Sequence, residues 1–154
     1  MEIRRASAGD IGGINALLRQ VLEVHHRGRP DIFRGGTKKY TDAELTEILT
    51  DDERPVFAAF DGGSLTGYVF CIAQKGGGNI LTDIRTLYID DLCVDESRRG
   101  EHIGTALYRY VVEYARSRGF YNVTLNVWTC NEAAMRFYGS LGMKPQKICM
   151  ETIL

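Results

Sequence analysis

The sequence predicts one α/β (α+β) domain over residues 1–154, built on a mixed sheet of about six to seven strands with helices on both faces. Its first half holds short apolar runs separated by glycine-rich turns, as in antiparallel strands. Its second half alternates segments of helical periodicity with strand-like runs. No linker, repeat or low-complexity tract divides the chain, and its apolar fraction of 44% is usual for one globular domain.

The chain is expected to begin with a short strand over residues 2–6, followed by a helix that starts at Ser7. Ser7 and Asp10 have the spacing of a capping box, in which each residue satisfies a backbone group of the other. Apolar residues then recur at helical spacing. Gly28 and Pro30 should end this helix.

A second helix and three strands complete the first half. Thr41 and Glu44 form another capping-box pattern, which predicts a short helix through Leu49. Two apolar runs around Asp61–Ser64 predict a β-hairpin. The expected strands span residues 55–60, 65–74 and 82–94, with a further turn at 76–79.

The second half is expected to add two helices and two strands, which gives the order β-α-α-β-β-β-α-β-α-β. Glycines at positions 119 and 142 should end the helices. The expected elements are a helix from Ile103 to Gly119, a strand over 121–128, a helix over 131–141 and a final strand over 147–154.

Charge and composition exclude several classes of protein. The net charge is -1, and the pairs Lys38-Lys39 and Arg98-Arg99 are too short to form a basic stripe, so no nucleic-acid partner is expected. The N-terminus lacks the apolar segment of a signal peptide, and no run of about 20 apolar residues occurs. We therefore expect a cytoplasmic protein with no membrane partner.

Cysteine spacing indicates neither a metal site nor a disulfide framework. No C-x-x-C pair occurs, and no histidine stands at metal-ligand spacing. Free cysteine behaves as a small apolar residue, so reduced core residues and no metal are expected. The four cysteines are Cys71, Cys93, Cys130 and Cys149.

A strand that ends at Val94, a polar turn and a glycine-containing helix start indicate a phosphate site. Free N–H groups at a helix N-terminus bind anions, and Gly100 and Gly104 allow close approach of the backbone. Arg98 or Arg99 could add charge-assisted hydrogen bonds. The alternative is a tight turn that needs glycine for its conformation alone.

This segment resembles the pyrophosphate loop of the GNAT superfamily of acyl-CoA N-acyltransferases. In that family a strand ending in Leu-x-Val precedes [Arg/Gln]-x-x-Gly-x-[Gly/Ala], which holds the pyrophosphate of CoA. The six motif positions are filled by Arg99, Gly100, Glu101, His102, Ile103 and Gly104. With Arg98 before the motif and Thr105 after it, these are the expected cofactor-binding residues of the loop. His102 stands where glycine is usual, so its φ is either negative or mildly strained.

A second segment, Asn131–Met143, is similar to the family pattern Asn-x-x-Ala-x-x-x-Tyr-x-x-x-Gly-[Phe/Met]. The resemblance implies that Asn131 caps a helix and contacts the CoA arm, and that Tyr138 lies near the CoA sulfur. Both motifs occur in the family's order. They imply the GNAT fold and an acetyl-CoA-dependent N-acetyltransferase acting by direct attack in a ternary complex.

The resemblance also assigns catalytic roles. The backbone of Leu92, Cys93 and Val94 would pair with the pantetheine arm and face the thioester carbonyl. Tyr138 is the candidate general acid, because a phenol can protonate a thiolate of comparable basicity. The alternative for Tyr138 is a core tyrosine on an amphipathic helix.

Asp90 and Asp91 are the candidate bases, since two adjacent carboxylates in an apolar strand are unusual. Strand alternation predicts that they point to opposite faces, although a bulge would change this. The alternative is that the acid orders the substrate or pairs with an arginine; Asp90 is also a candidate substrate-binding residue.

The acceptor is expected to be a small amine, such as a polyamine, amino acid, amino sugar or aminoglycoside. His25, His26 and Phe33 fall where the family builds its acceptor wall, although a solvated or helix-ending role is the alternative for the histidines. Leu125-Asn126-Val127 lacks the glutamate typical of family enzymes that modify protein N-termini. The other hypotheses are a protein N-terminal or lysine acetyltransferase and a silent acyl-CoA-binding module. Family precedent also allows a homodimer.

Overall fold

The computed structural model describes residues 1–154, which form a five-stranded sheet in the order β1-β2-β3-β4-β5. The first four strands are antiparallel neighbours, whereas β4 and β5 run parallel. The strands are β1 (Glu2–Arg5), β2 (Val56–Asp61), β3 (Ser64–Lys75), β4 (Arg85–Val94) and β5 (Asn122–Leu125).

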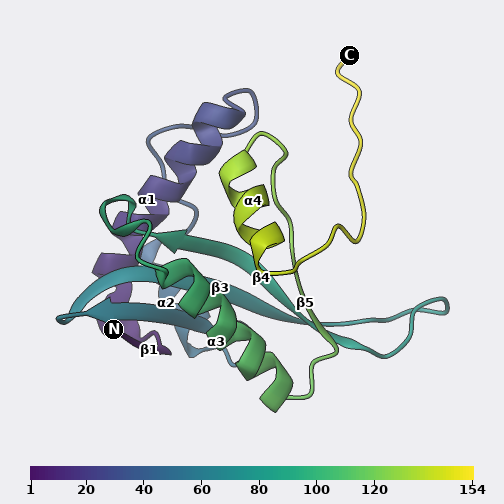
Figure 1. Cartoon of the computed structure of the whole chain (residues 1–154), viewed down its shortest axis with the longest axis horizontal. Coiled ribbons are helices and arrows are strands. Elements are labelled where there is room, and N and C mark those ends of the chain that lie inside the picture. The colour runs from purple at the N-terminus through teal and green to yellow at the C-terminus, as the bar shows by residue number, and fades with distance from the viewer.

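Four α-helices cover the two faces of this sheet, as predicted. Two short 3-10 helices, η1 (Ala8–Asp10) and η2 (Glu96–Arg98), complete the secondary structure. Figure 1 shows α1 and α4 on one side of the sheet and α3 on the other. The helices are α1 (Ile11–Gly28), α2 (Asp42–Thr50), α3 (Ile103–Ser117) and α4 (Glu132–Ser140).

Strand alternation divides the core into two apolar clusters, one on each face. Along β2, Ala58 and Phe60 pack with α1 and α2, while Phe57 and Ala59 pack with α3. Each face is therefore sealed by an amphipathic helix whose apolar stripe matches one side of the pleat.

The predicted helix starts and hairpin are confirmed. Asp10 Oδ2 accepts the Ser7 N–H at 2.8 Å, and Glu44 Oε2 accepts the Thr41 N–H at 2.7 Å, so both capping boxes form. Gly62 and Gly63 join β2 to β3 with φ values of 55° and 83°, which a two-residue hairpin turn of this kind requires.

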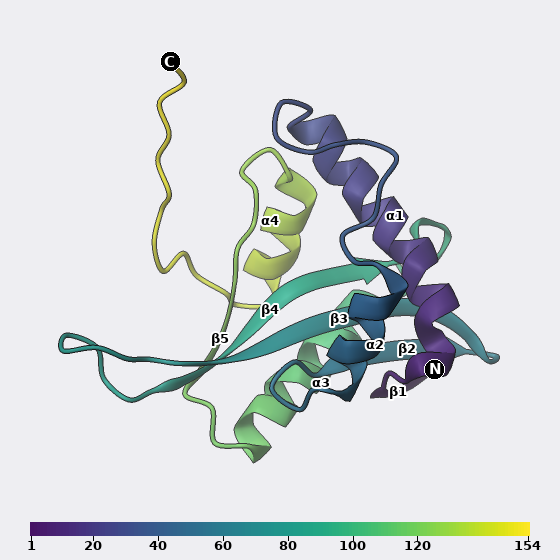
Figure 2. The same ribbon diagram turned by 180° about the vertical axis from the view of Figure 1, so that it is seen from behind.

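The predicted final strand is wrong, and the sheet has five strands rather than six or seven. Residues 143–154 form an extended tail that leaves the body of the molecule (Figures 1 and 2). The outer edge of β5 consequently has no partner strand. The apolar run of this tail predicted a strand, but no strand of the same chain pairs with it.

The cysteines also differ from expectation. All four are free, but only Cys71 and Cys93 are buried, whereas Cys130 and Cys149 are exposed. Cys149 lies on the tail and Cys130 in the loop before α4, so neither belongs to the core. None of the helices is long and apolar enough to cross a membrane; the expected cytoplasmic location stays a prediction.

Candidate active site

A β-bulge in β4 turns both candidate acids to the same face of the sheet. Asp91 pairs with Phe70 and Ile89 pairs with Cys71, so Asp90 is the extra residue without a partner. Asp90 contacts Tyr40 and Asp91 contacts Tyr68, and both tyrosines pack in the cluster beneath α1 and α2. The prediction of opposite faces is therefore wrong, because Asp90 is itself the extra residue of the bulge and does not follow the alternation of its neighbours.

Asp90 is already neutralised by its neighbours. Its Oδ2 accepts hydrogen bonds from Tyr40 Oη at 2.6 Å and from Lys39 Nζ at 2.7 Å. Lys39 and Tyr40 lie in the segment just before α2. This ion pair occupies the carboxylate, so Asp90 is poorly suited to accept a proton from a substrate.

Asp91 lies in a far less polar setting. Tyr68 Oη donates to its Oδ2 at 2.9 Å and is the one side chain that donates to it. Burial raises the pKa of Asp91 to about 6, an effect that the positive charge of Lys39 partly opposes. A carboxylate with such a pKa is ionised at neutral pH yet able to hold a proton transiently.

Tyr138 projects from α4, and its phenol hydroxyl makes no hydrogen bond within the protein. Burial raises the pKa of its phenol well above the usual range, and the negative charge of Asp91 raises it further. The phenol therefore carries its proton at neutral pH. Its ring meets Phe137 edge to face, with ring centroids 5.0 Å apart.

An opening between β4 and β5 lies beside these groups. The parallel pairing ends at Ile89 and Leu125, where β5 stops, but β4 continues to Val94. Beyond Ile89, β4 has β3 on one side and no strand on the other. The backbone of Leu92, Cys93 and Val94 thus lies along a free edge on which an extended ligand can form hydrogen bonds.

Cys93 is not an activated nucleophile. Its thiol donates to the Leu17 carbonyl oxygen at 3.6 Å, inside the core. Burial raises its pKa to about 12, and the charge of Asp91 adds to this rise. The side chain therefore stays a neutral thiol.

The loop that follows β4 has the form of an anion cradle. Asp95 fixes its start by accepting the Ser97 N–H at 2.9 Å. Gly100 and His102 then adopt φ values of 88° and 61°, and His102 is the only residue other than glycine with a positive φ. No side chain caps α3, so the N–H groups of its first turn remain open to a ligand.

Of the two arginines in this loop, only Arg99 is free. Arg98 is held by Glu101 and Asp61, each with a nitrogen–oxygen distance of 2.7 Å. Arg99 forms no ion pair or side-chain hydrogen bond. Arg98 and Glu101 therefore shape the loop, whereas Arg99 can meet a phosphate.

Three further loop positions contribute through the backbone. The side chain of Ile103 is buried in the core, so only its N–H faces the loop. At Gly104 a Cβ would lie 3.2 Å from Phe137 Cζ, which shows how closely α3 and α4 approach. Thr105 completes the first turn of α3.

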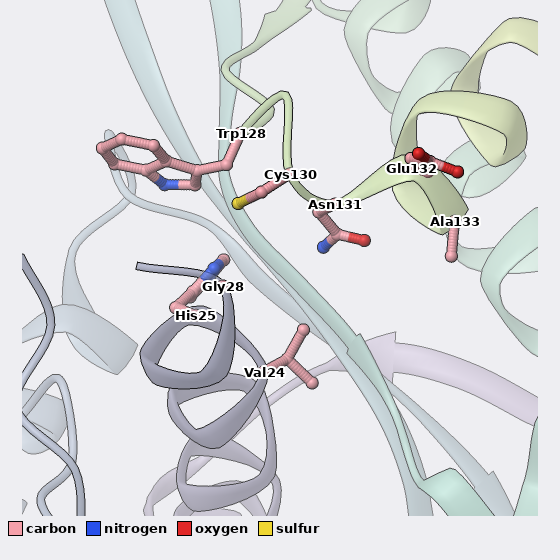
Figure 3. Close-up of a pocket in the computed structure, with 8 residues that line it drawn as sticks. All are labelled: Val24, His25, Gly28, Trp128, Cys130, Asn131, Glu132 and Ala133. Carbon is pink, nitrogen blue, oxygen red and sulfur yellow. The ribbon is translucent and has the colours of Figure 1, made fainter. Parts of the chain in front are cut away.

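A cavity of about 290 Å³ opens between the end of α1 and the start of α4. Figure 3 shows side chains of α1 facing the loop that carries Trp128 and Cys130. Asn131 also lines it and accepts the Ala134 N–H at 3.1 Å, so it caps α4 as predicted. The lining residues are Val24, His25, Gly28, Trp128, Cys130, Asn131, Glu132 and Ala133.

Aromatic rings form one wall beside this cavity. His25 stacks on Phe33 with ring centroids 5.0 Å apart, and Phe33 meets Trp128 edge to face at 5.2 Å. Burial lowers the pKa of His25, and Lys39 lowers it further, so the imidazole is neutral at physiological pH. His26 differs: its Nδ1 donates to the Phe33 carbonyl oxygen at 2.7 Å, and its side chain does not line the cavity.

Comparison with known proteins decides the family. The model of the acetyltransferase (GNAT) family matches residues 18–143, which include the cradle, β4 and α4. The chain belongs to the GNAT family. As a GNAT acetyltransferase it is an enzyme, and members of this family use acetyl-CoA as the acetyl donor.

The chain is similar to a curated sequence and to two solved structures. Thialysine N-epsilon-acetyltransferase of Bos taurus is 29% identical over 150 residues, which cover 91% of this chain and 82% of that protein. The tetramutant of BH1408 from Bacillus halodurans is 32% identical, with a TM-score of 0.95 and complete coverage of both chains. Aminoglycoside N-acetyltransferase AAC(6')-Iy in complex with CoA is 15% identical with a TM-score of 0.75, covering 99% of this chain and 98% of the other, and it shares the fold.

The candidate site contains four residues that the sequence analysis did not assign to it: Lys39, Tyr40, Tyr68 and Trp128. Lys39 and Tyr40 reach Asp90 across about fifty positions of sequence, so no local pattern could reveal them. Trp128 had a signal, because it is the one tryptophan and follows directly on β5.

Proposed function

We propose that residues 1–154 form a single domain that transfers an acetyl group from acetyl-CoA to the primary amine of a small molecule, by direct attack in a ternary complex. One observation carries this proposal: β4, which bears the carboxylate of Asp91, keeps a free edge beyond Ile89 and leads into the anion cradle at the start of α3. Asp91 would act as the base and the phenol of Tyr138 as the acid that acyl transfer to an amine requires.

The donor fits the residues that surround this edge. The cradle from Gly100 to Thr105 offers N–H groups to the pyrophosphate, and Arg99 adds a free positive charge. Beyond Ile89, the edge of β4 offers backbone hydrogen bonds to the pantetheine arm, and Asn131 lines the cavity at the start of α4. When bound, acetyl-CoA supplies the electrophilic thioester carbonyl.

The protein then has two proton transfers to manage. Asp91 accepts a proton from the ammonium form of the acceptor, directly or through water, and passes it to solvent. The neutral amine forms the C–N bond as the C–S bond breaks. Tyr138 donates its proton to the departing sulfur and is reprotonated by the second proton that the amine loses, so the products are the N-acetyl amine and CoA.

A small amine suits the acceptor cavity of about 290 Å³. Its rings, His25 and Trp128 with Phe33 behind them, can hold the aliphatic chain of a cationic amine. The names of relatives that act on thialysine and aminoglycosides agree with an amine on a small molecule. A protein N-terminus or lysine remains the alternative acceptor.

We also propose that the enzyme is a homodimer. The tail exposes Ile148, Met150 and Ile153 by 78–84% of their surface, and Glu151 is bonded to Arg29 at 2.6 Å, which directs the tail away from β5. The unpaired edge of β5 and this apolar tail occur together in every copy of the chain. In a dimer with two-fold symmetry, the tail of each copy could therefore pair with the free β5 edge of the other.

Calorimetry with acetyl-CoA and a CoA-release assay test the enzymatic proposal. Arg99→Ala should weaken acetyl-CoA binding by about tenfold or more, since it removes a charged hydrogen bond, whereas Arg98→Ala should change it less than about threefold. Tyr138→Phe should lower kcat by about 100-fold or more and leave binding unchanged.

An amine panel for the CoA-release assay should include thialysine, spermidine, glucosamine, sisomicin and a lysine-containing peptide. Release with a small amine supports the proposal, and release with the peptide alone favours the protein substrate. Intact acetyl-CoA binding without release from any of these amines would instead identify a silent acyl-CoA-binding module.

A further inference from the structure

Tyr68 of β3 is a buried phenol whose hydroxyl has one partner. Its side chain is 0% exposed, and its Oη donates to Asp91 Oδ2 at 2.9 Å. Phe70 meets its ring edge to face, with centroids 5.0 Å apart. A buried hydroxyl needs a hydrogen-bond partner, so the ring packing and the hydrogen bond together fix where the carboxylate lies.

No other side chain can replace this hydrogen bond, and the only further donor that favours the charged carboxylate is the backbone N–H of Leu92. Lys39 and Tyr40 both donate to Asp90, and no other side chain donates to Asp91. The titratable groups that face Asp91 are Tyr68 of β3, Asp90 and Cys93 of β4, Lys39 and Tyr40 before α2, and Tyr138 of α4. Among these, only Tyr68 donates to the carboxylate itself.

We infer that Tyr68 is a positioning residue, which holds the Asp91 carboxylate toward the acceptor and keeps it ionised under working conditions; this inference rests on the proposed function. A hydrogen bond donated to the charged form of an acid favours that form. Without the donor, Asp91 would hold its proton to higher pH and would be free to rotate away from the incoming amine.

Tyr68→Phe tests this role, and Tyr40→Phe is a matched control. Each variant removes one phenol hydroxyl and with it the hydrogen bond to one carboxylate, that of Asp91 in the first case and that of Asp90 in the second. The first readout needs no substrate: an NMR titration of aspartate carboxyl carbons, with the Asp91 signal assigned from Asp91→Asn. In Tyr68→Phe the midpoint of Asp91 should rise by about one pH unit. In Tyr40→Phe it should move by less than about 0.3 unit, because Tyr40 contacts the other acid.

The second readout is kcat/KM from pH 5 to 9 with the best amine of the panel above. The acid limb should move to higher pH in Tyr68→Phe in step with the NMR midpoint, and stay in place in Tyr40→Phe. In an Asp91→Asn background, the additional change Tyr68→Phe should alter kcat/KM less than twofold, since its effect passes through the carboxylate. Thermal unfolding checks that each variant is folded.

The outcomes separate the two proposals. An unchanged Asp91 midpoint in folded Tyr68→Phe overturns the positioning role and leaves the proposed function standing. A shifted midpoint with an unshifted rate profile, or an active Asp91→Asn enzyme, removes Asp91 as the base and the role of Tyr68 with it.

Discussion

His102 shows how one residue can carry conformational cost in a binding loop. Its φ of 61° is the only positive value outside glycine, and its side chain does not cap α3. The left-handed conformation costs a residue with a Cβ about 1–2 kcal/mol, whereas glycine adopts it freely. The family pattern left the sign of this φ open, and the structure shows that the strain is accepted.

His102→Gly should therefore keep the cradle intact. Relief of strain is partly offset by the greater entropy of glycine in the unfolded chain, so stability should rise by at most about 1 kcal/mol. Calorimetry should give an acetyl-CoA affinity within about threefold of the native value, or tighter. His102→Ala is the control that keeps the Cβ and removes the ring. A tenfold loss of affinity in both variants would instead show that the imidazole contacts the donor.

Other single-residue roles differed in how far sequence could predict them. The helix caps at Ser7, Thr41 and Asn131 were predictable because their partners lie three residues away. The sheet face toward which the side chains of Asp90 and Asp91 point could not be predicted, because the bulge is defined by the pairing of β4 with β3. Patterns within one segment contain no information about such a partner.

The contact between α3 and α4 controls the geometry of the site at the level of elements. Gly104 opens α3, and a Cβ there would lie 3.2 Å from Phe137 Cζ and 3.5 Å from Val94 Cγ2. Phe137 precedes Tyr138 in α4. Any displacement of this contact would therefore move the candidate acid.

Gly104→Ala and Gly139→Ala form a matched pair that tests the contact. Each gains helix propensity, but at Gly139 an added Cβ meets nothing within 4 Å. Gly139→Ala should raise the free energy of unfolding in urea by roughly 0.5–1 kcal/mol. Gly104→Ala should show no gain, or a loss of about 1 kcal/mol, because Phe137 must move. Equal gains at both positions would mean that the contact is not tight.

Most elements were predictable because their signals are local. The hairpin at Gly62 and Gly63 and the helices from Ile11 and Ile103 lie where periodicity and turn residues indicated. The final strand failed for a different reason. An apolar run indicates that a segment can be a strand, but the presence of a partner is a property of the whole assembly.

At the scale of the whole molecule, the exposed tail and the protruding β3–β4 hairpin lie on the same side, flanking β5 (Figures 1 and 2). Ile80 in this hairpin is 94% exposed, and Ile148 in the tail is 78% exposed. Large apolar side chains in such positions are usual at protein interfaces. They support the proposed homodimer.

Removal of residues 145–154 should convert the dimer to a folded monomer. Analytical ultracentrifugation at about 10–50 μM should give twice the chain mass for the full protein and a single chain mass for the truncated one. Ile148→Asp with Ile153→Asp should act likewise at unchanged length. Circular dichroism confirms that the fold persists, and a monomeric full-length protein would contradict the proposal.

The cavity between α1 and α4 was the least predictable feature of the molecule. Phe33 and Trp128 meet across 95 positions of sequence, and His25 joins them from α1. Sequence identified the two histidines and Phe33 by family position, but their contacts depend on how α1, α4 and the two loops come together. The anion cradle was easier to predict from sequence, since it lies within one continuous segment.

The bulge at Asp90 also decides what a one-codon deletion would do to this stretch of the gene. Loss of that codon would make Ile89 and Asp91 consecutive opposite Cys71 and Phe70, which are consecutive in β3, so the ladder would become regular. Asp91 would still lie beside Tyr68, and Cys93 would stay in the core beneath α1. A loss of three nucleotides that preserves the reading frame would thus remove the ion pair with Lys39 and keep the candidate base in its place.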